Sequence, residues 1–281
     1  MSAVGVIGGG TMGIGIAYAF ATCGWRTHIV ETDVARAEGL AASIRERAAV
    51  GVARGRLAAE RAAALPELLS VVASVDDLPT GLSLIVESVP ERLELKLDLL
   101  VAAEKRGPTL LATNTSALSI DELAAVLARP ERFLGMHFFN PVWSIPLLEI
   151  VRGEATSELA VERAHAIGVG IGKDPIVVRN VPGFATSRLD NIAAFEAMRM
   201  LQEGVASAAD IDKALMLGYG HPIGPLRLSD VVGLDVRLDI AHTLSARYGE
   251  RYAAPQILID LVAAGRLGRK TGRGFFDWAD D

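Results

Sequence analysis

The sequence of 281 residues predicts an α/β fold, in which a Rossmann-like, doubly wound and mostly parallel sheet is followed by a smaller all-helical domain. Two observations predict this class. Up to about residue 180, short β-branched runs alternate with helical patterns, which favours parallel strands joined by helices. After VPGF at 181–184, only helical patterns follow. We therefore expect one domain at residues 1–180 and a helical domain at residues 181–281.

The expected elements follow the chain in order. A strand at 3–8, a helix around GIAYAFATCG and a strand at 27–31 form a βαβ unit of about 30 residues. An Ala- and Arg-rich helical stretch then covers about 34–64. Later strands are expected at 68–74, 82–88, 109–114, 133–139, 147–151 and 175–180, and the helical patterns of the second domain at 188–204, 208–218, 228–249 and 254–268.

Composition narrows the class of protein. The formal charge of −6 argues against a general nucleic-acid binder. No apolar run reaches the roughly 18 residues of a membrane span, and no basic segment precedes the first apolar stretch, so we expect neither a membrane span nor a signal peptide. A single cysteine, Cys23, fits a reducing compartment. We therefore expect a cytoplasmic protein.

The segment GVIGGGTMGIGIA at 5–17 contains the dinucleotide fingerprint Gly8-x-Gly10-x-x-Gly13 between a predicted strand and a predicted helix. The first glycine allows a tight turn, the second a close approach of a pyrophosphate, and the third close packing of the helix. Glu31 ends the next strand, 18 positions after Gly13. A carboxylate there binds ribose hydroxyls and repels a 2′-phosphate, so we expect NAD as the cofactor. An ordinary glycine-rich turn is the alternative.

Two segments are candidates for the chemistry. His137 lies in an apolar strand and Glu149 in the next, and the turn-prone NPVWSIP between them folds the second strand back toward the first. A histidine beside a buried carboxylate is a good general base. The alternative is a core histidine bonded to a backbone carbonyl.

The second segment, TNTSALSIDEL at 113–123, places Asn114, Thr115 and Ser116 at the carboxyl end of a strand, where ligands bind in open α/β sheets. A helix cap by Ser116 or Ser119 explains the same residues without a site.

Several motifs together resemble the L-3-hydroxyacyl-CoA dehydrogenase family, which includes the 3-hydroxybutyryl-CoA dehydrogenases. The resemblance covers nearly the whole chain. It rests on the order of GGGTMGIGIA, ESVPERLELK, TNTSALSI, RFLGMHFFNP, LLEIV, NVPGF, EGVASAADIDKAL, HPIGPLRLSDVVGLD and GRKTGRGFFDW.

The resemblance implies roles for individual residues. His137 is the catalytic base, Glu149 its partner, and Ser116 binds the 3-hydroxyl or 3-keto oxygen. NAD is held by the glycine turn and by further residues, namely Gly8, Gly9, Gly10, Thr11, Met12, Gly13, Glu31, Glu91, Lys96, Ser116 and Lys270. Lys96 is also expected near the substrate.

The resemblance also places a basic residue, Arg54, against coenzyme A, with Arg45, Arg47 and Arg56 as further charges. A solvated helix face is the alternative explanation for these arginines. No metal is expected. A homodimer through the helical domain is expected because IAAFEAMRML at 192–201 is apolar on more than one face.

One position departs from the family. The asparagine that normally precedes the arginine after PGF is Ser187 here, in PGFATSRL. A shorter hydroxyl replaces an amide that helps to hold the substrate in the family, so Ser187 is a candidate member of the site.

The expected function is the reversible NAD-dependent oxidation of an (S)-3-hydroxyacyl-CoA to the 3-oxoacyl-CoA, a reaction of fatty-acid metabolism among other pathways. Two alternatives stay open at this point. One is a dehydrogenase of a free hydroxy acid such as gulonate or carnitine, and the other is a dinucleotide-binding relative without turnover.

Overall fold

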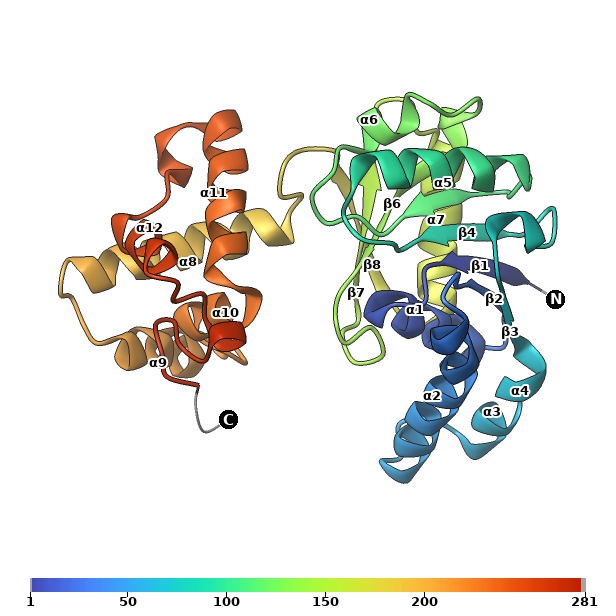
Figure 1. Cartoon of the computed structure of the whole chain (residues 1–281), viewed down its shortest axis with the longest axis horizontal. Coiled ribbons are helices and arrows are strands. Elements are labelled where there is room, and N and C mark those ends of the chain that lie inside the picture. The colour runs from blue at the N-terminus through green and yellow to red at the C-terminus, as the bar shows by residue number, and fades with distance from the viewer. Residues whose placement is uncertain (1, 279–281) are drawn as a thin grey trace. The chain divides into compact units, whose positions relative to one another are not determined.

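The computed structural model describes residues 2–278, and the chain divides after Val181 into two compact units (Figure 1). The first unit is built on one sheet and the second is made of helices. The fold class expected from the sequence is confirmed.

Eight strands form the sheet of the first unit, in the order β3-β2-β1-β4-β5-β6-β7-β8. They are β1 (Ala3–Ile7), β2 (Arg26–Val30), β3 (Leu69–Val72), β4 (Leu84–Glu87), β5 (Leu111–Thr113), β6 (Phe133–Phe138), β7 (Leu147–Arg152) and β8 (Asp174–Arg179). The first six run parallel, and β7 pairs antiparallel with β6 and parallel with β8. Because the chain order reverses between β1 and β4, the ligand crevice of a doubly wound sheet is expected at the carboxyl ends of these two strands.

Seven α-helices and two 3₁₀ turns accompany the described strands. They are α1 (Thr11–Thr22), α2 (Val34–Ala53), α3 (Ala59–Ala63), α4 (Leu65–Leu68), α5 (Leu93–Lys105), α6 (Ile120–Ala124), α7 (Glu158–Gly170), η1 (Val75–Asp77) and η2 (Pro130–Arg132).

The helical stretch expected at 34–64 is interrupted. Helix α2 ends at Ala53 because Gly55 takes a left-handed backbone conformation, with φ of 65°. In this position the Arg56 N–H donates to the Gly51 carbonyl, which closes the helix as glycine C-caps do. The break turns Arg54 and Arg56 away from a continuous helix face, and this places them beside a cavity described below.

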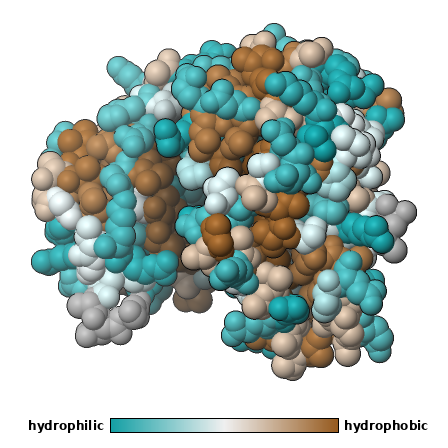
Figure 2. Space-filling model, turned by 45° about the vertical axis from the view of Figure 1, so that its right-hand side comes forward, coloured by the Kyte–Doolittle hydropathy of each residue, from teal (hydrophilic) through white to brown (hydrophobic). Residues whose placement is uncertain are grey.

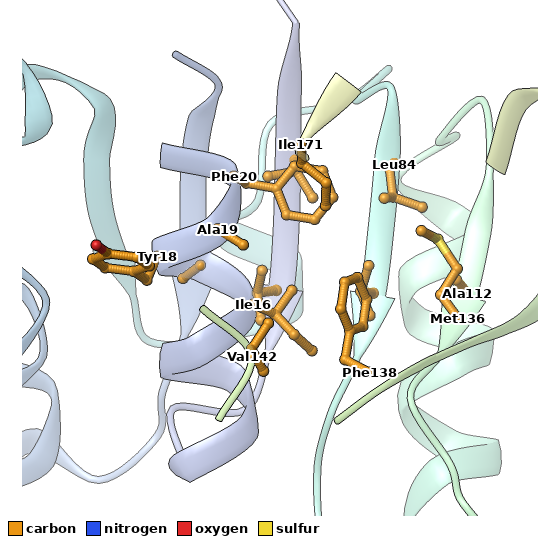
Figure 3. Close-up of a cluster of buried hydrophobic side chains, with 14 of the residues drawn as sticks. Ile16, Tyr18, Ala19, Phe20, Leu84, Ala112, Met136, Phe138, Val142 and Ile171 are labelled. Atoms are coloured by element: carbon orange, nitrogen blue, oxygen red, sulfur yellow. The ribbon is translucent and has the colours of Figure 1, made fainter. Parts of the chain in front are cut away.

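The main core lies where α1 covers the sheet. Ile16 and Phe20 of α1 are fully buried and belong to one cluster with Phe138 of β6 and Val142 of the following turn (Figure 3). The Val142 side chain fits against Gly15, where an added Cβ would come within 2.7 Å of it. The turn between β6 and β7 is therefore packed directly against the first helix.

The helical unit contains α8 (Thr186–Gln202), α9 (Ala208–Tyr219), α10 (Pro225–Val232), α11 (Leu234–Tyr248), α12 (Gln256–Ala263), η3 (Glu250–Tyr252) and η4 (Arg269–Thr271). The single pattern at 228–249 forms two helices, because Gly233 takes a φ of 106° between them. Buried Asp230 of α10 accepts hydrogen bonds from Phe275 N–H, Phe276 N–H and Trp278 Nε1–H. This carboxylate fastens the last described segment to the helices.

Among residues 2–278, no helix combines the length and the apolar character that crossing a membrane requires.

Candidate active site

The glycine turn joins β1 to α1, and at two of its positions neighbouring backbone leaves no room for a side chain. A Cβ on Gly8 would lie 2.8 Å from the Ser88 carbonyl oxygen, and a Cβ on Gly13 would lie 1.8 Å from that of Gly8. Gly10, by contrast, has no atom within 4 Å of such a Cβ. Helix α1 also begins without a side-chain cap, so its first N–H groups face this open space. The turn therefore fits the pyrophosphate of a dinucleotide.

Glu31 follows β2 and borders the same turn. Its Oε1 accepts a hydrogen bond of 2.9 Å from the Asp33 N–H, and its Oε2 would lie 2.7 Å from a Cβ on Gly9. A cavity of about 470 Å³ opens here, lined among others by Gly9, Gly10 and Thr11. The Met12 side chain is partly buried and packs against the main core, so its contact with the cofactor stays a prediction. The residues present fit NAD.

A buried ion-pair network stands at the carboxyl ends of β4 and β5. The Lys96 ammonium lies 2.8 Å from Glu87 and 3.0 Å from Glu91, and also donates to the Val89 carbonyl. Glu87 is fully buried and accepts a further bond from the Thr113 hydroxyl. Since these acceptors use all three protons of the ammonium, Lys96 positions the two carboxylates, and its contact with a substrate stays a prediction.

Glu91 connects this network to the loop of Ser116. Its Oε1 accepts hydrogen bonds from the Thr115 hydroxyl and from the Ser116 N–H, the latter of 2.9 Å. Burial acts to raise the pKa of the Glu91 carboxyl, but the Lys96 ammonium and these hydrogen bonds outweigh it and hold the pKa below its usual value. An ionised Glu91 therefore fixes the loop that presents Ser116.

The Ser116 loop is also tied to the strand of the histidine, because Asn114 Oδ1 accepts a 2.8 Å hydrogen bond from the Phe138 N–H. The Ser116 residue is exposed, and the cap of α6 is Ser119, whose Oγ accepts from the Glu122 N–H. Of the two serines, Ser119 thus accounts for the predicted cap, which leaves Ser116 as the site candidate.

His137 and Glu149 lie directly opposite each other on the antiparallel strands β6 and β7. His137 Nδ1 is 2.8 Å from Glu149 Oε2, the histidine is 7% exposed and the glutamate 0%. An ionised carboxylate only accepts hydrogen bonds, so Nδ1 carries the proton and Nε2 keeps a lone pair. This arrangement suits a general base.

A second cavity of about 590 Å³ is strongly basic. Its lining includes Arg47, Arg54, Arg56, Arg61 and Lys173 against one carboxylate, Glu46. The Arg47 guanidinium stacks 3.6 Å from the centre of the Trp143 ring, which belongs to the turn between β6 and β7. Lys173 donates to the Val142 and Ile145 carbonyls of that turn, and burial lowers the pKa of its ammonium. Arg45 is exposed and does not line this cavity.

Two predicted residues lie in the helical unit. Ser187 is in the first turn of α8, where its carbonyl accepts a 2.6 Å bond from Asn191 Nδ2. Lys270, in η4, pairs with Asp235 at 2.5 Å.

In the described part of the chain, no group of three or more His, Cys, Asp or Glu side chains is arranged to hold a metal ion.

Comparison with known protein families identifies both units. The family model described as 3-hydroxyacyl-CoA dehydrogenase, NAD binding domain, matches residues 3–181, and the C-terminal domain of the same family matches residues 183–278. The chain belongs to the 3-hydroxyacyl-CoA dehydrogenase family. The resemblance stated from the motifs is confirmed, and NAD is the cofactor of the first unit.

Relatives of this family align over almost the full chain. A 3-hydroxybutyryl-CoA dehydrogenase of Clostridioides difficile is 36% identical over 97% of this chain and 98% of its own length. A 3-hydroxyadipyl-CoA dehydrogenase of Escherichia coli K12 is 38% identical over 98% of this chain and 58% of its own. The crystal structure of an (S)-3-hydroxybutyryl-CoA dehydrogenase from Ralstonia eutropha superposes with a TM-score of 0.93 at 36% identity, over 99% of each chain.

Several residues that lie at these sites were not among those predicted from the sequence. Glu87 stands in the quoted motif ESVPERLELK, and a carboxylate ending a buried strand was the available signal. Arg61 and Lys173 join Arg54 only through the tertiary fold, so no spacing along the chain indicates their shared cavity.

Two glycine substitutions test whether the close contact at Gly13 and the open space at Gly10 affect stability differently. We expect Gly13→Ala to lower the melting temperature by several degrees, about 4 °C or more, because its methyl group collides with the Gly8 carbonyl. Gly10→Ala meets open space and should leave the melting temperature within about 1 °C of the parent. Differential scanning calorimetry measures both melting temperatures. An equal decrease in the two variants would contradict the close contact between Gly13 and the Gly8 carbonyl.

Proposed function

We propose that this chain oxidises (S)-3-hydroxyacyl-CoA thioesters reversibly to 3-oxoacyl-CoA, with His137 as the base. The observation that carries the proposal is the buried His137–Glu149 pair in a chain of this family. Bound NAD supplies the hydride acceptor. The relatives' names give the substrate class, since they are dehydrogenases of 3-hydroxybutyryl-CoA and 3-hydroxyadipyl-CoA.

In this proposal the imidazole does the proton transfer. His137 Nε2 takes the proton of the 3-hydroxyl group while its Nδ1–H stays bonded to Glu149. The ionised carboxylate stabilises the imidazolium that forms, and returns the ring to the same tautomer when the proton leaves. In the reverse direction the imidazolium protonates the 3-keto oxygen.

The other predicted residues hold the reactants. Ser116 hydrogen-bonds to the reacting oxygen, on a loop fixed by Glu91 and Asn114. The turn from Gly8 to Gly13 and the carboxylate of Glu31 bind the cofactor, and the ion pair of Lys96 supports its nicotinamide side. Ser187 and Lys270 belong to the helical unit, and their contacts, of Ser187 with the substrate and of Lys270 with the cofactor, stay predictions.

Removal of the base is the direct test. We expect His137→Gln to lower kcat for 3-hydroxybutyryl-CoA at least about 100-fold, the usual contribution of a general base. The dissociation constant of NADH, measured by its fluorescence, should change little because the glycine turn is intact. Normal turnover by the variant would contradict the assignment. A parent chain that binds NADH and turns over no substrate would favour the alternative of a non-catalytic relative.

We also propose that the basic cavity receives the phosphorylated nucleotide of coenzyme A. Five cations against one carboxylate attract phosphate groups, and the Trp143 ring with its stacked Arg47 offers a flat surface for an adenine. Trp143 lies in the turn that joins the strands of His137 and Glu149, so thioester binding and the catalytic pair share one hairpin.

Charge removal at the cavity should affect only substrates that carry the nucleotide. We expect Arg54→Gln to raise KM for 3-hydroxybutyryl-CoA about fivefold, and Arg45→Gln, outside the cavity, to change it less than about twofold. With the N-acetylcysteamine thioester, which lacks the nucleotide, both variants should have the same KM as the parent. An equal effect of Arg54→Gln on both thioesters would contradict the proposal, and faster turnover of a free hydroxy acid would favour the alternative substrate class.

We propose a homodimer formed through the helical unit. Hydrophobic residues are visible on its surface (Figure 2), and Leu217 and Tyr219 of α9 are 83% and 81% exposed. Burial of such side chains against a second copy of the chain is favourable.

The single Cys23 forms no disulfide, which fits the reducing cytoplasm, where we propose the enzyme acts.

Light scattering should therefore give twice the mass of one chain. We expect Leu217→Asp to shift the sample toward the single-chain mass, because a carboxylate in the interface loses its water. Leu159→Asp, at an exposed position of α7 in the first unit, serves as the control and should not shift it. A parent protein with the mass of one chain contradicts the dimer.

A further inference from the structure

Arg36 lies at the edge of the cofactor cavity, beside the carboxylate that selects the cofactor. It belongs to the first turn of α2 and lines the cavity together with Gly9, Gly10 and Thr11. Its guanidinium is 3.6 Å from Glu31 Oε2 and 3.4 Å from Asp33 Oδ2, and its side chain is 59% exposed. An arginine thus stands between two carboxylates at the position where the adenosine ribose is expected.

The charges of this group decide what it can bind. Two carboxylates and one guanidinium leave a net charge of −1, which attracts no phosphate. Without the charge of Glu31, the remaining Asp33 and Arg36 are balanced, and the guanidinium becomes available for new hydrogen bonds. A guanidinium binds phosphate oxygens through two parallel N–H donors, which makes arginine well suited to recognise a phosphate group.

We propose that Arg36 is able to bind the 2′-phosphate of NADP, and that in the native protein the negative charge of Glu31 prevents this by pairing with the Arg36 guanidinium. The preference for NAD then resides in the Glu31–Arg36 pair and not in Glu31 alone. This inference rests on the proposed function only in placing the adenosine ribose beside Glu31. It assigns to Arg36 a part in cofactor specificity.

The local geometry offers a conservative way to remove the charge. Glu31 Oε1 accepts a hydrogen bond from the Asp33 N–H, which positions the start of α2. The side-chain carbonyl of a glutamine accepts the same bond, so Glu31→Gln removes the negative charge and keeps the turn. The Arg36 backbone then keeps its place, because its N–H is bonded to Asp33 Oδ1, and the guanidinium keeps its contact with Asp33 Oδ2.

The experiment compares the parent with Glu31→Gln, with Glu31→Gln/Arg36→Gln, and with Glu31→Gln/Arg45→Gln. The last two have the same net charge, but Arg45 is exposed on α2 and does not line the cavity. Two quantities are measured for each protein. They are the ratio of kcat/KM with NADP to that with NAD, and the ratio of the dissociation constants of NADH and NADPH from nucleotide fluorescence.

We expect Glu31→Gln to shift both ratios toward the phosphorylated cofactor about 100-fold. The variant removes the repulsion between the Glu31 carboxylate and the 2′-phosphate, and it frees the Arg36 guanidinium to attract that phosphate. Arg36→Gln should remove at least about tenfold of this gain, and Arg45→Gln less than about twofold. An absent gain in Glu31→Gln, or an equal loss in the two double variants, overturns the inference. A parent without turnover overturns the proposed function instead, while the binding ratios still decide the role of Arg36.

Discussion

The hydrogen bond between His137 and Glu149 is the constraint on which the rest of the site depends. A fully buried carboxylate is stable only when it is paired, and its partner here is the imidazole directly opposite on the neighbouring strand. The antiparallel return of β7 exists because a short turn joins it to β6. That turn is held by Val142 against α1 and by the Lys173 ammonium. The packing of the first helix therefore fixes the catalytic pair.

The rule that a buried charge must be paired also explains the ion-pair network of Glu87, Lys96 and Glu91 at the carboxyl ends of the strands. Glu87 and Lys96 are both buried, and each would be costly alone. The Lys96 ammonium of this pair also helps to hold Glu91 ionised next to the Ser116 loop, so the pair serves to position a serine as well. Other charged side chains border cavities, namely the basic cavity and the cavity beside Glu31, where anionic or sugar groups of ligands are expected.

Much of this arrangement is readable in the sequence, since it depends on local patterns. The β-branched runs locate the strands, the glycine spacing locates the cofactor turn, and the turn-prone segment after His137 indicates the hairpin with Glu149. Other features are not visible in such patterns. The break of the helical stretch at Gly55 follows from one backbone conformation, and the meeting of Arg54 with Lys173 follows from how α2 packs on the sheet. No periodicity along the chain carries that information.

The tautomer of His137 tests the central claim most directly. In ¹⁵N-labelled protein, two-bond ¹H–¹⁵N correlation spectra distinguish a ring nitrogen with a proton from one without. The His137→Gln spectrum identifies the signals. The account predicts that neutral His137 carries its proton on Nδ1, toward Glu149, and has an unprotonated Nε2. A protonated Nε2 with a bare Nδ1 would contradict it, because such a ring has no base to offer to a substrate hydroxyl.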